Sequence, residues 1–100
     1  MENFKDIINA DRLTLVDFFA SWCGPCKMMH PVLEQLKQEL GDGIRIIKLD
    51  VDKNEALAFQ YGIRSVPTLM LFKSGKTLWR QSGAMQLDDL KNLINQYSTI

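Results

Sequence analysis

The arrangement of apolar and polar positions along the chain predicts four strands. Two runs are apolar on both faces, as in buried strands, and they cover residues 13–20 and 68–72. A third β-rich run, IRIIKLDV, covers residues 44–51. The run at 76–82 alternates like a half-exposed edge strand and follows Ser74-Gly75, a two-residue hairpin turn. The last two strands are therefore expected to be antiparallel.

Apolar residues spaced three and four apart predict three helices, and a capping-box pattern predicts a fourth. They are expected at residues 3–10, 23–40, 52–60 and from Leu87 to about Tyr97. Asn3 is expected to cap the first, and Asp52 with Glu55 resembles a capping box that opens the third. A strand, a long helix and a strand come first, so a right-handed crossover between parallel strands is expected. The pattern predicts an α/β fold.

Length and charge narrow the class of protein. One hundred residues without a linker or repeat indicate a single domain, 1–100. Twelve basic residues balance twelve acidic residues, which argues against nucleic acid or an anionic membrane as partner. No apolar run approaches the ~20 residues of a membrane helix. The first residues do not resemble a secretion signal, so a cytoplasmic protein is expected, although a matured secreted chain would look the same.

The two cysteines are the most informative residues of the chain. Cys23 and Cys26 are separated only by Gly24-Pro25, so a disulfide between them would constrain little of the unfolded chain. A metal site would need more ligands, and the sequence offers one histidine and no second CxxC pair. A metal shared between two chains remains an alternative. The spacing favours a redox pair, with no cofactor and no metal.

Several segments resemble the thioredoxin family. Trp22-Cys23-Gly24-Pro25-Cys26-Lys27 follows a buried strand, and the downstream segments keep the family's order and spacing. These segments are Lys48–Asp52, Tyr61–Thr68, Leu71–Gly75 and Gly83-Ala84. The resemblance implies a thioredoxin fold with a central mixed sheet flanked by helices. The family's usual extra N-terminal strand is not expected here, which leaves four strands in the order 44–51, 13–20, 68–72, 76–82.

The resemblance also implies the activity, a protein-disulfide reductase that works by thiol–disulfide exchange. Cys23 lies at a helix N-terminus, where the helix dipole stabilises the attacking thiolate, and Cys26 resolves the mixed disulfide. Gly24 and Pro25 tune the redox potential. The implied partners are client proteins with disulfides and an NADPH-dependent thioredoxin reductase, and a monomer is expected.

Two charged residues are implied in proton transfer. Asp17 is anomalous because it lies in the most apolar strand, on the face of Leu13, Leu15 and Phe19. The resemblance assigns it as the group that takes and returns the proton of Cys26, with Lys48 on the neighbouring strand modulating its charge. The alternatives are that Asp17 and Lys48 form a purely structural ion pair, or that both lie at solvated strand ends.

A client-docking surface is implied around the cysteines. The resemblance predicts a cis peptide bond before Pro67, and Val66 presents backbone groups to an extended client. The surface is expected to comprise Trp22, Gly24, Pro25, Val66, Pro67, Gly83 and Ala84. For Trp22 the alternative is plain core packing.

The sequence leaves open the role of His30 and two alternative functions. His30 is expected to be a packed, hydrogen-bonded histidine, the sharper hypothesis being an influence on Cys26. A disulfide oxidase or isomerase is disfavoured by the Gly24-Pro25 dipeptide, because oxidising relatives often carry histidine at the second position. A binding or chaperone-like subunit that uses the apolar surface is the other alternative.

Overall fold

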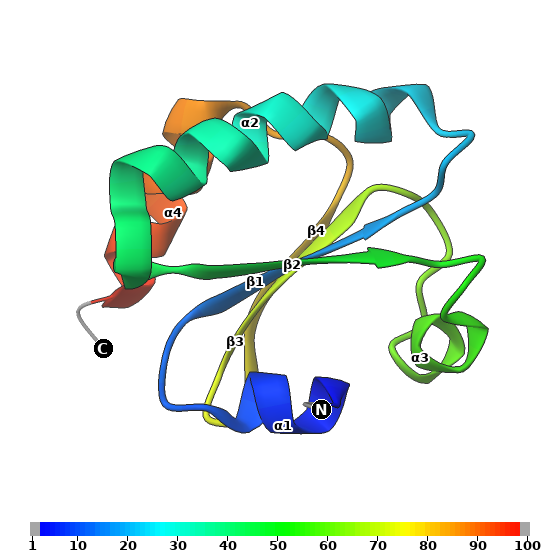
Figure 1. Cartoon of the computed structure of the whole chain (residues 1–100), viewed down its shortest axis with the longest axis horizontal. Coiled ribbons are helices and arrows are strands. Elements are labelled where there is room, and N and C mark those ends of the chain that lie inside the picture. The colour runs from blue at the N-terminus through cyan, green and yellow to red at the C-terminus, as the bar shows by residue number, and fades with distance from the viewer. Residues whose placement is uncertain (1–2, 99–100) are drawn as a thin grey trace.

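The computed structural model describes residues 3–98 and shows three layers (Figure 1). A four-stranded sheet has the order β2-β1-β3-β4, with β1 (Thr14–Phe19), β2 (Arg45–Asp50), β3 (Thr68–Lys73) and β4 (Lys76–Ser82). β1 runs parallel to β2 and antiparallel to β3, and β3 is antiparallel to β4. The mixed sheet and its strand order confirm the expected fold class.

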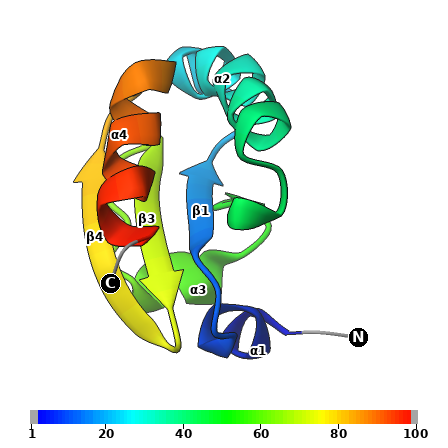
Figure 2. The same cartoon turned by 90° about the vertical axis from the view of Figure 1, so that its left-hand side faces the viewer.

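Helices cover both faces of the sheet (Figures 1 and 2). α2 (Gly24–Leu40) and α4 (Leu87–Ser98) lie on one face, whereas α1 (Phe4–Asn9) and α3 (Glu55–Gln60) lie on the other. A single 3-10 turn, Gly41–Gly43, ends α2. The described residues contain no strand before α1, which leaves β2 as an edge of the sheet.

The central strands are buried because helices pack on both of their faces. The α2–α4 side of the core includes Leu15, Leu33, Leu71 and Leu90, and the α1–α3 side includes Phe18 and Phe72. The outer strands are only half-buried, and β4 is largely exposed. The buried strands fix the position of the end of β1. The loop that leads to the two cysteines and α2 begins there.

The capping box expected at Asp52 is wrong. The N-cap of α3 is Asn54, whose side chain makes no capping hydrogen bond, and its amide instead donates to the Asp50 carbonyl at 3.0 Å. The Asp52 backbone amide donates to the Asp50 carboxylate at 2.9 Å. The Asp52 carboxylate accepts a hydrogen bond from the Trp22 indole, which lies next to Cys23 in the chain.

Candidate functional site

The two cysteines occupy the first turn of α2 and are joined by a disulfide. Their Cα atoms are 5.2 Å apart. Cys23 is the N-cap of α2, and its sulfur accepts a hydrogen bond from the Cys26 backbone amide at 3.1 Å. Cys26 is fully buried and Cys23 is 5% exposed, so Cys23 is the more accessible sulfur of the pair. The Cys26 amide, which the Cys23 sulfur caps, is also a donor for the anionic form of Cys23.

The residues between the cysteines form the exposed rim of this turn. Pro25 lies in the first turn of α2, where the missing N–H breaks no helical hydrogen bond. Gly24 is exposed, and a Cβ built on it would meet no atom within 4 Å. Packing therefore gives no reason for glycine at this position, and its proposed part in redox tuning rests on the resemblance.

Asp17 is a fully buried acid on the sheet below α2. It belongs to the same face of β1 as Phe19, which packs against the cluster that contains both cysteines. Neither of its carboxylate oxygens has a hydrogen-bond partner among the described residues. Burial raises the pKa of Asp17 from 3.8 to about 6, although the charge of Lys48 acts in the opposite direction. The group can therefore change protonation state close to neutral pH.

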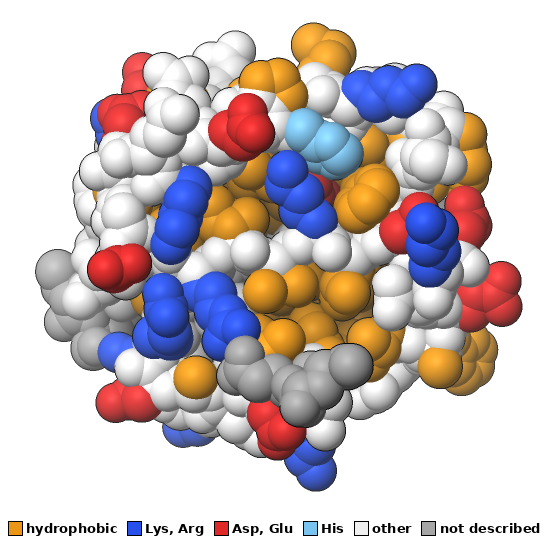
Figure 3. Space-filling view, in the orientation of Figure 1, with side chains coloured by type: hydrophobic (Ala, Val, Ile, Leu, Met, Phe, Trp, Pro, Cys, Tyr) orange, Lys and Arg blue, Asp and Glu red, His pale blue; other side chains and the backbone are white. Residues whose placement is uncertain are grey.

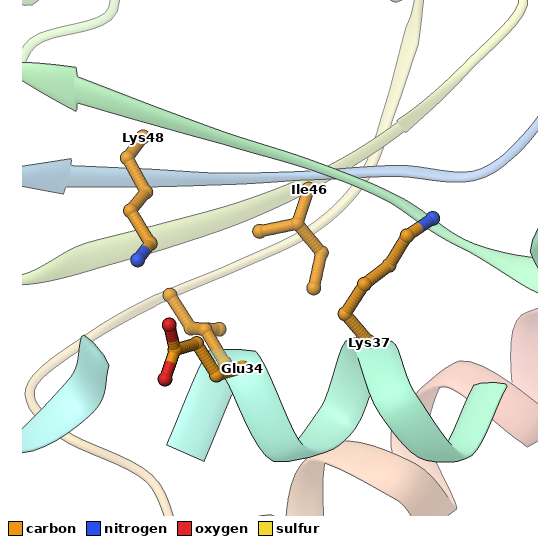
Figure 4. A pocket seen from close by; sticks show the side chains of 5 residues that line it. Glu34, Lys37, Ile46 and Lys48 are labelled. Atoms are coloured by element: carbon orange, nitrogen blue, oxygen red, sulfur yellow. The ribbon is translucent and has the colours of Figure 1, made fainter. Parts of the chain in front are cut away.

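Lys48 is the parallel-strand partner of Asp17 and stands at the open edge of the sheet. The two residues are Cα partners in the β1–β2 register. The lysine side chain is exposed and borders a hollow of about 190 Å³ between α2 and β2, where it points toward Glu34 (Figure 4). On this face of the molecule, basic side chains stand among apolar ones (Figure 3). Lys48 is thus placed to act on Asp17 by charge while keeping its ammonium in water.

His30 is packed, although its Nε2 atom is buried without a hydrogen-bond partner among the described residues. Its ring meets the ring of Phe19 edge to face, with centroids 5.2 Å apart. Burial and the charge of Lys48 lower the pKa of His30, and Glu34 opposes this shift. The packing matches the expectation for this residue, whereas the expected hydrogen bond is not made at Nε2 within the described part of the chain.

Trp22 and Val66 lie beside the disulfide. Trp22 is 69% exposed, which excludes the alternative that it is a core residue. Together with Val51 and residues 63–66, Trp22 lines a hollow of about 140 Å³. The Val66 carbonyl lies 3.6 Å from the Cys23 sulfur, and the Val66–Pro67 peptide bond is cis. An exposed indole, a backbone carbonyl and a shallow hollow are features that an extended peptide can engage.

The end of β4 completes this surface. Gly83 donates its backbone N–H to the Pro67 carbonyl at 2.8 Å, and it has a φ of +100°, which favours glycine. Gly83 and Ala84 are both exposed. The following residue, Met85, donates its backbone N–H to the sulfur of Met29 at 3.2 Å. These bonds hold the 83–85 segment between Pro67 and α2.

One residue at this surface, Asp52, was not predicted from the sequence. Its carboxylate accepts a hydrogen bond from the Trp22 indole Nε1 at 3.0 Å. Thirty residues separate the two, and the local pattern around Asp52 indicated a helix cap. One signal could have placed Asp52 near Trp22. Asp52 follows a strand that runs parallel to β1, and parallel strands end at the same edge of the sheet.

Two general features of the described residues bear on function. Among residues 3–98, no three His, Cys, Asp or Glu side chains are grouped so that they could hold a metal ion. None of the helices within the same range combines the length and the apolar character that spanning a membrane requires.

Comparison with known proteins gives a consistent result. The thioredoxin family model matches residues 1–96. The thioredoxin of Chlamydia caviae is 52% identical over 97 residues, covering 97% of this chain and 93% of that protein. The thioredoxin of Haemophilus influenzae is 46% identical over 91 residues, covering 91% and 85%.

Solved structures agree with the sequence relatives. A Malassezia sympodialis thioredoxin superposes with a TM-score of 0.86 at 38% identity, covering 95% of this chain and 85% of that one. A mutant thioredoxin from Halobacterium salinarum gives a TM-score of 0.84 at 44% identity, covering 93% and 81%. With a cysteine pair at disulfide distance, the protein is a thiol–disulfide oxidoreductase that acts on disulfide substrates and depends on a reductase partner. The chain belongs to the thioredoxin family.

Proposed function

We propose that the protein reduces disulfides of client proteins through Cys23 and Cys26, and that its own disulfide is reduced again by an NADPH-dependent thioredoxin reductase. The observation that supports this most strongly is the Cys23–Cys26 disulfide at the start of α2, beside an exposed apolar surface. We further infer a monomer that works in the cytoplasm as a single domain. Two cysteines confined to one CxxC pair suit a reducing compartment.

In the proposed first step, the Cys23 thiolate attacks one sulfur of the client disulfide. The S–S bond breaks, the client's other sulfur leaves as a thiolate, and a mixed disulfide with Cys23 forms. The cap position of Cys23 supports its part as nucleophile, because the Cys26 amide and the helix N-terminus stabilise the thiolate.

In the second step, Cys26 gives its proton to the Asp17 carboxylate and attacks the Cys23 sulfur. The client's remaining thiolate leaves, so two electrons have passed to the client and the Cys23–Cys26 bond has formed. The raised pKa of Asp17 supports this role, because a group that titrates near pH 6 can accept a proton at neutral pH and return it later. Lys48 modulates Asp17 by its charge.

The docking surface consists of Trp22, Val66, Pro67, Gly83 and Ala84, with Gly24 and Pro25 at its rim. An extended client segment would lie across it and use the Val66 backbone as a neighbouring strand does. Because the surface is shallow, we expect it to accept many client sequences, with most of the affinity from backbone bonds and apolar contact.

Insulin reduction tests the proposal. With dithiothreitol as reductant, the wild type should accelerate insulin reduction, and Cys23→Ser should not. With NADPH and a thioredoxin reductase in place of dithiothreitol, NADPH should be consumed in proportion to the disulfides reduced. Binding of insulin without turnover would indicate a binding or chaperone-like subunit. Faster oxidation of a dithiol client than reduction of the corresponding disulfide client would indicate an oxidase or isomerase.

A further inference from the structure

The loop between α3 and β3 supplies part of the proposed docking surface. Residues 63–66 line the hollow beside Trp22, and Val66 lies against the disulfide. The position of this loop therefore determines where a client backbone lies relative to the Cys23 sulfur.

α3 does little to fix that loop. The helix has six residues, none of them buried, and its N-cap side chain makes no capping hydrogen bond. At its end the amides of Gly62 and Ile63 donate to the Phe59 and Ala58 carbonyls, at 3.0 and 2.9 Å. With Gly62 at a φ of +62°, this is a Schellman ending, which satisfies those two carbonyls and leaves the Tyr61 and Gly62 carbonyls without a partner in the helix.

Arg80 on β4 reaches these open carbonyls. Its Nη1 donates to the carbonyl of Tyr61, and its Nη2 donates to the carbonyl of Gly62 at 2.9 Å. The planar guanidinium can hold two acceptors at once, and its positive charge suits the partial negative charge of a helix C-terminus. A lysine ammonium would be a single point of contact, whereas the guanidinium presents two nitrogens, one to each carbonyl.

The other end of the loop is tied to the start of β3, beside the end of β4. Thr68 donates its hydroxyl hydrogen to the Ser65 carbonyl at 2.7 Å, and its Oγ1 lies 3.1 Å from the Ser82 Oγ. Arg80 and Ser82 are two residues apart, so their side chains leave the same face of β4. β4 thus holds one end of the segment that leads to Val66 directly, through Arg80, and supports the other end through Thr68 of β3.

We propose that Arg80 is a positioning residue that fixes the 61–66 loop for client binding, an inference that rests on the proposed reductase function. Its hydrogen bonds go to the end of α3 and not to the cysteines. Loss of Arg80 should leave the reactivity of Cys23 intact while weakening the capture of a protein client.

The test compares Arg80→Ala with Lys76→Ala, which removes an exposed cation from the same strand away from the loop. For Arg80→Ala we expect the KM for insulin to rise roughly tenfold, the scale for losing one or two hydrogen bonds to a charged group, with kcat little changed. Reaction of the reduced protein with the small disulfide dithionitrobenzoate should stay within about twofold of wild type, since no client backbone is bound. Lys76→Ala should match the wild type, and Arg80→Lys should be intermediate.

Hydrogen exchange provides a readout that does not depend on turnover. In Arg80→Ala the amides of Gly62 and Ile63 should exchange faster, while those of β1 keep their protection; if this variant is too unstable, Arg80→Lys is measured instead. Unchanged KM and unchanged exchange would overturn the proposal, as would an equal loss of reactivity toward the small disulfide. Failure of the wild type to reduce insulin would overturn the proposed function, whereas the exchange result would still decide the part played by Arg80.

Discussion

Asp17 and Lys48 are direct partners across the parallel pair β1–β2, with the acid fully buried and the lysine exposed at the sheet edge. The acid bears the cost of desolvation, and the lysine offsets part of it without leaving water. This arrangement keeps the pKa of a buried carboxyl near 6 instead of higher. An acid that titrates there is suited to exchange a proton with a thiol at neutral pH.

The first prediction concerns the stability cost of Asp17. Since its pKa is raised to about 6, the folded state binds this proton more tightly than the unfolded chain does. The stabilisation from this group is fully present below pH 3.8 and is lost as pH rises through about 6. Asp17→Asn should therefore raise the free energy of unfolding of the oxidised protein by about 1–3 kcal/mol at neutral to slightly alkaline pH.

Denaturant melts above pH 7 and below pH 3.8 measure this effect, because the gain should nearly vanish at the lower pH. Asp42→Asn, which changes an exposed acid, is the control and should give no gain in the free energy of unfolding.

In stopped-flow experiments Asp17→Asn should also slow resolution of the mixed disulfide, while the first attack by Cys23 changes less. A less stable variant with normal resolution would make Asp17 a structural residue.

The second prediction concerns Lys48. Its charge lowers the pKa of Asp17, so Lys48→Met should move that pKa above about 6. The pH midpoint of the resolution step should move upward in the same direction. Lys76→Met removes a distant exposed lysine and should leave the midpoint in place. A midpoint that is the same in Lys48→Met and wild type would show that Lys48 has no part in proton transfer.

The third prediction concerns the hydrogen bond between Trp22 and Asp52. Removing the acceptor in Asp52→Ala frees the indole, so we expect the tryptophan fluorescence to change and the KM for insulin to rise by roughly threefold to tenfold, the scale of one exposed hydrogen bond. Asp42→Ala provides the matched control. Unaltered fluorescence and KM would mean that the bond does not order the docking surface.

The fourth prediction concerns the open edge of the sheet. Arg45 and Val51 donate their backbone N–H groups to Leu13 and Phe19 of the neighbouring segment, at 2.9 and 2.8 Å. By alternation, the amides of residues 46, 48 and 50 should point away from β1. They should exchange at least about a hundredfold faster than those of residues 47 and 49. Uniform protection along β2 in a monomer would show that another segment covers this edge.

The strands were predictable because the central strands are covered on both faces, whereas their order came from the resemblance. Continuous apolar runs such as 14–19 and 68–72 have no other stable place in a small domain. Burial of Asp17 was predictable for the same reason, since alternation put it on a core-facing side. The cis bond at Pro67 came only from the resemblance, because chance favours trans.

Long-range polar contacts could not be predicted. Asp52 fitted a helix cap by its spacing to Glu55, and nothing nearby in the sequence pointed to Trp22. Arg80 has the sequence context of an ordinary polar residue in an exposed strand, although it holds the end of α3. Such contacts depend on where two elements meet in space, and hydrophobic periodicity carries no information about that.

Trapping of the mixed disulfide tests the central claim most directly. A Cys26→Ser variant lacks the resolving thiol, so client proteins should accumulate on it as disulfide-linked adducts, and peptide mapping should place every link at Cys23. A Cys23→Ser variant should trap little, because Cys26 is fully buried. Adducts that map to Cys26 in Cys23→Ser, with none on Cys26→Ser, would reverse the two roles and contradict the proposed mechanism.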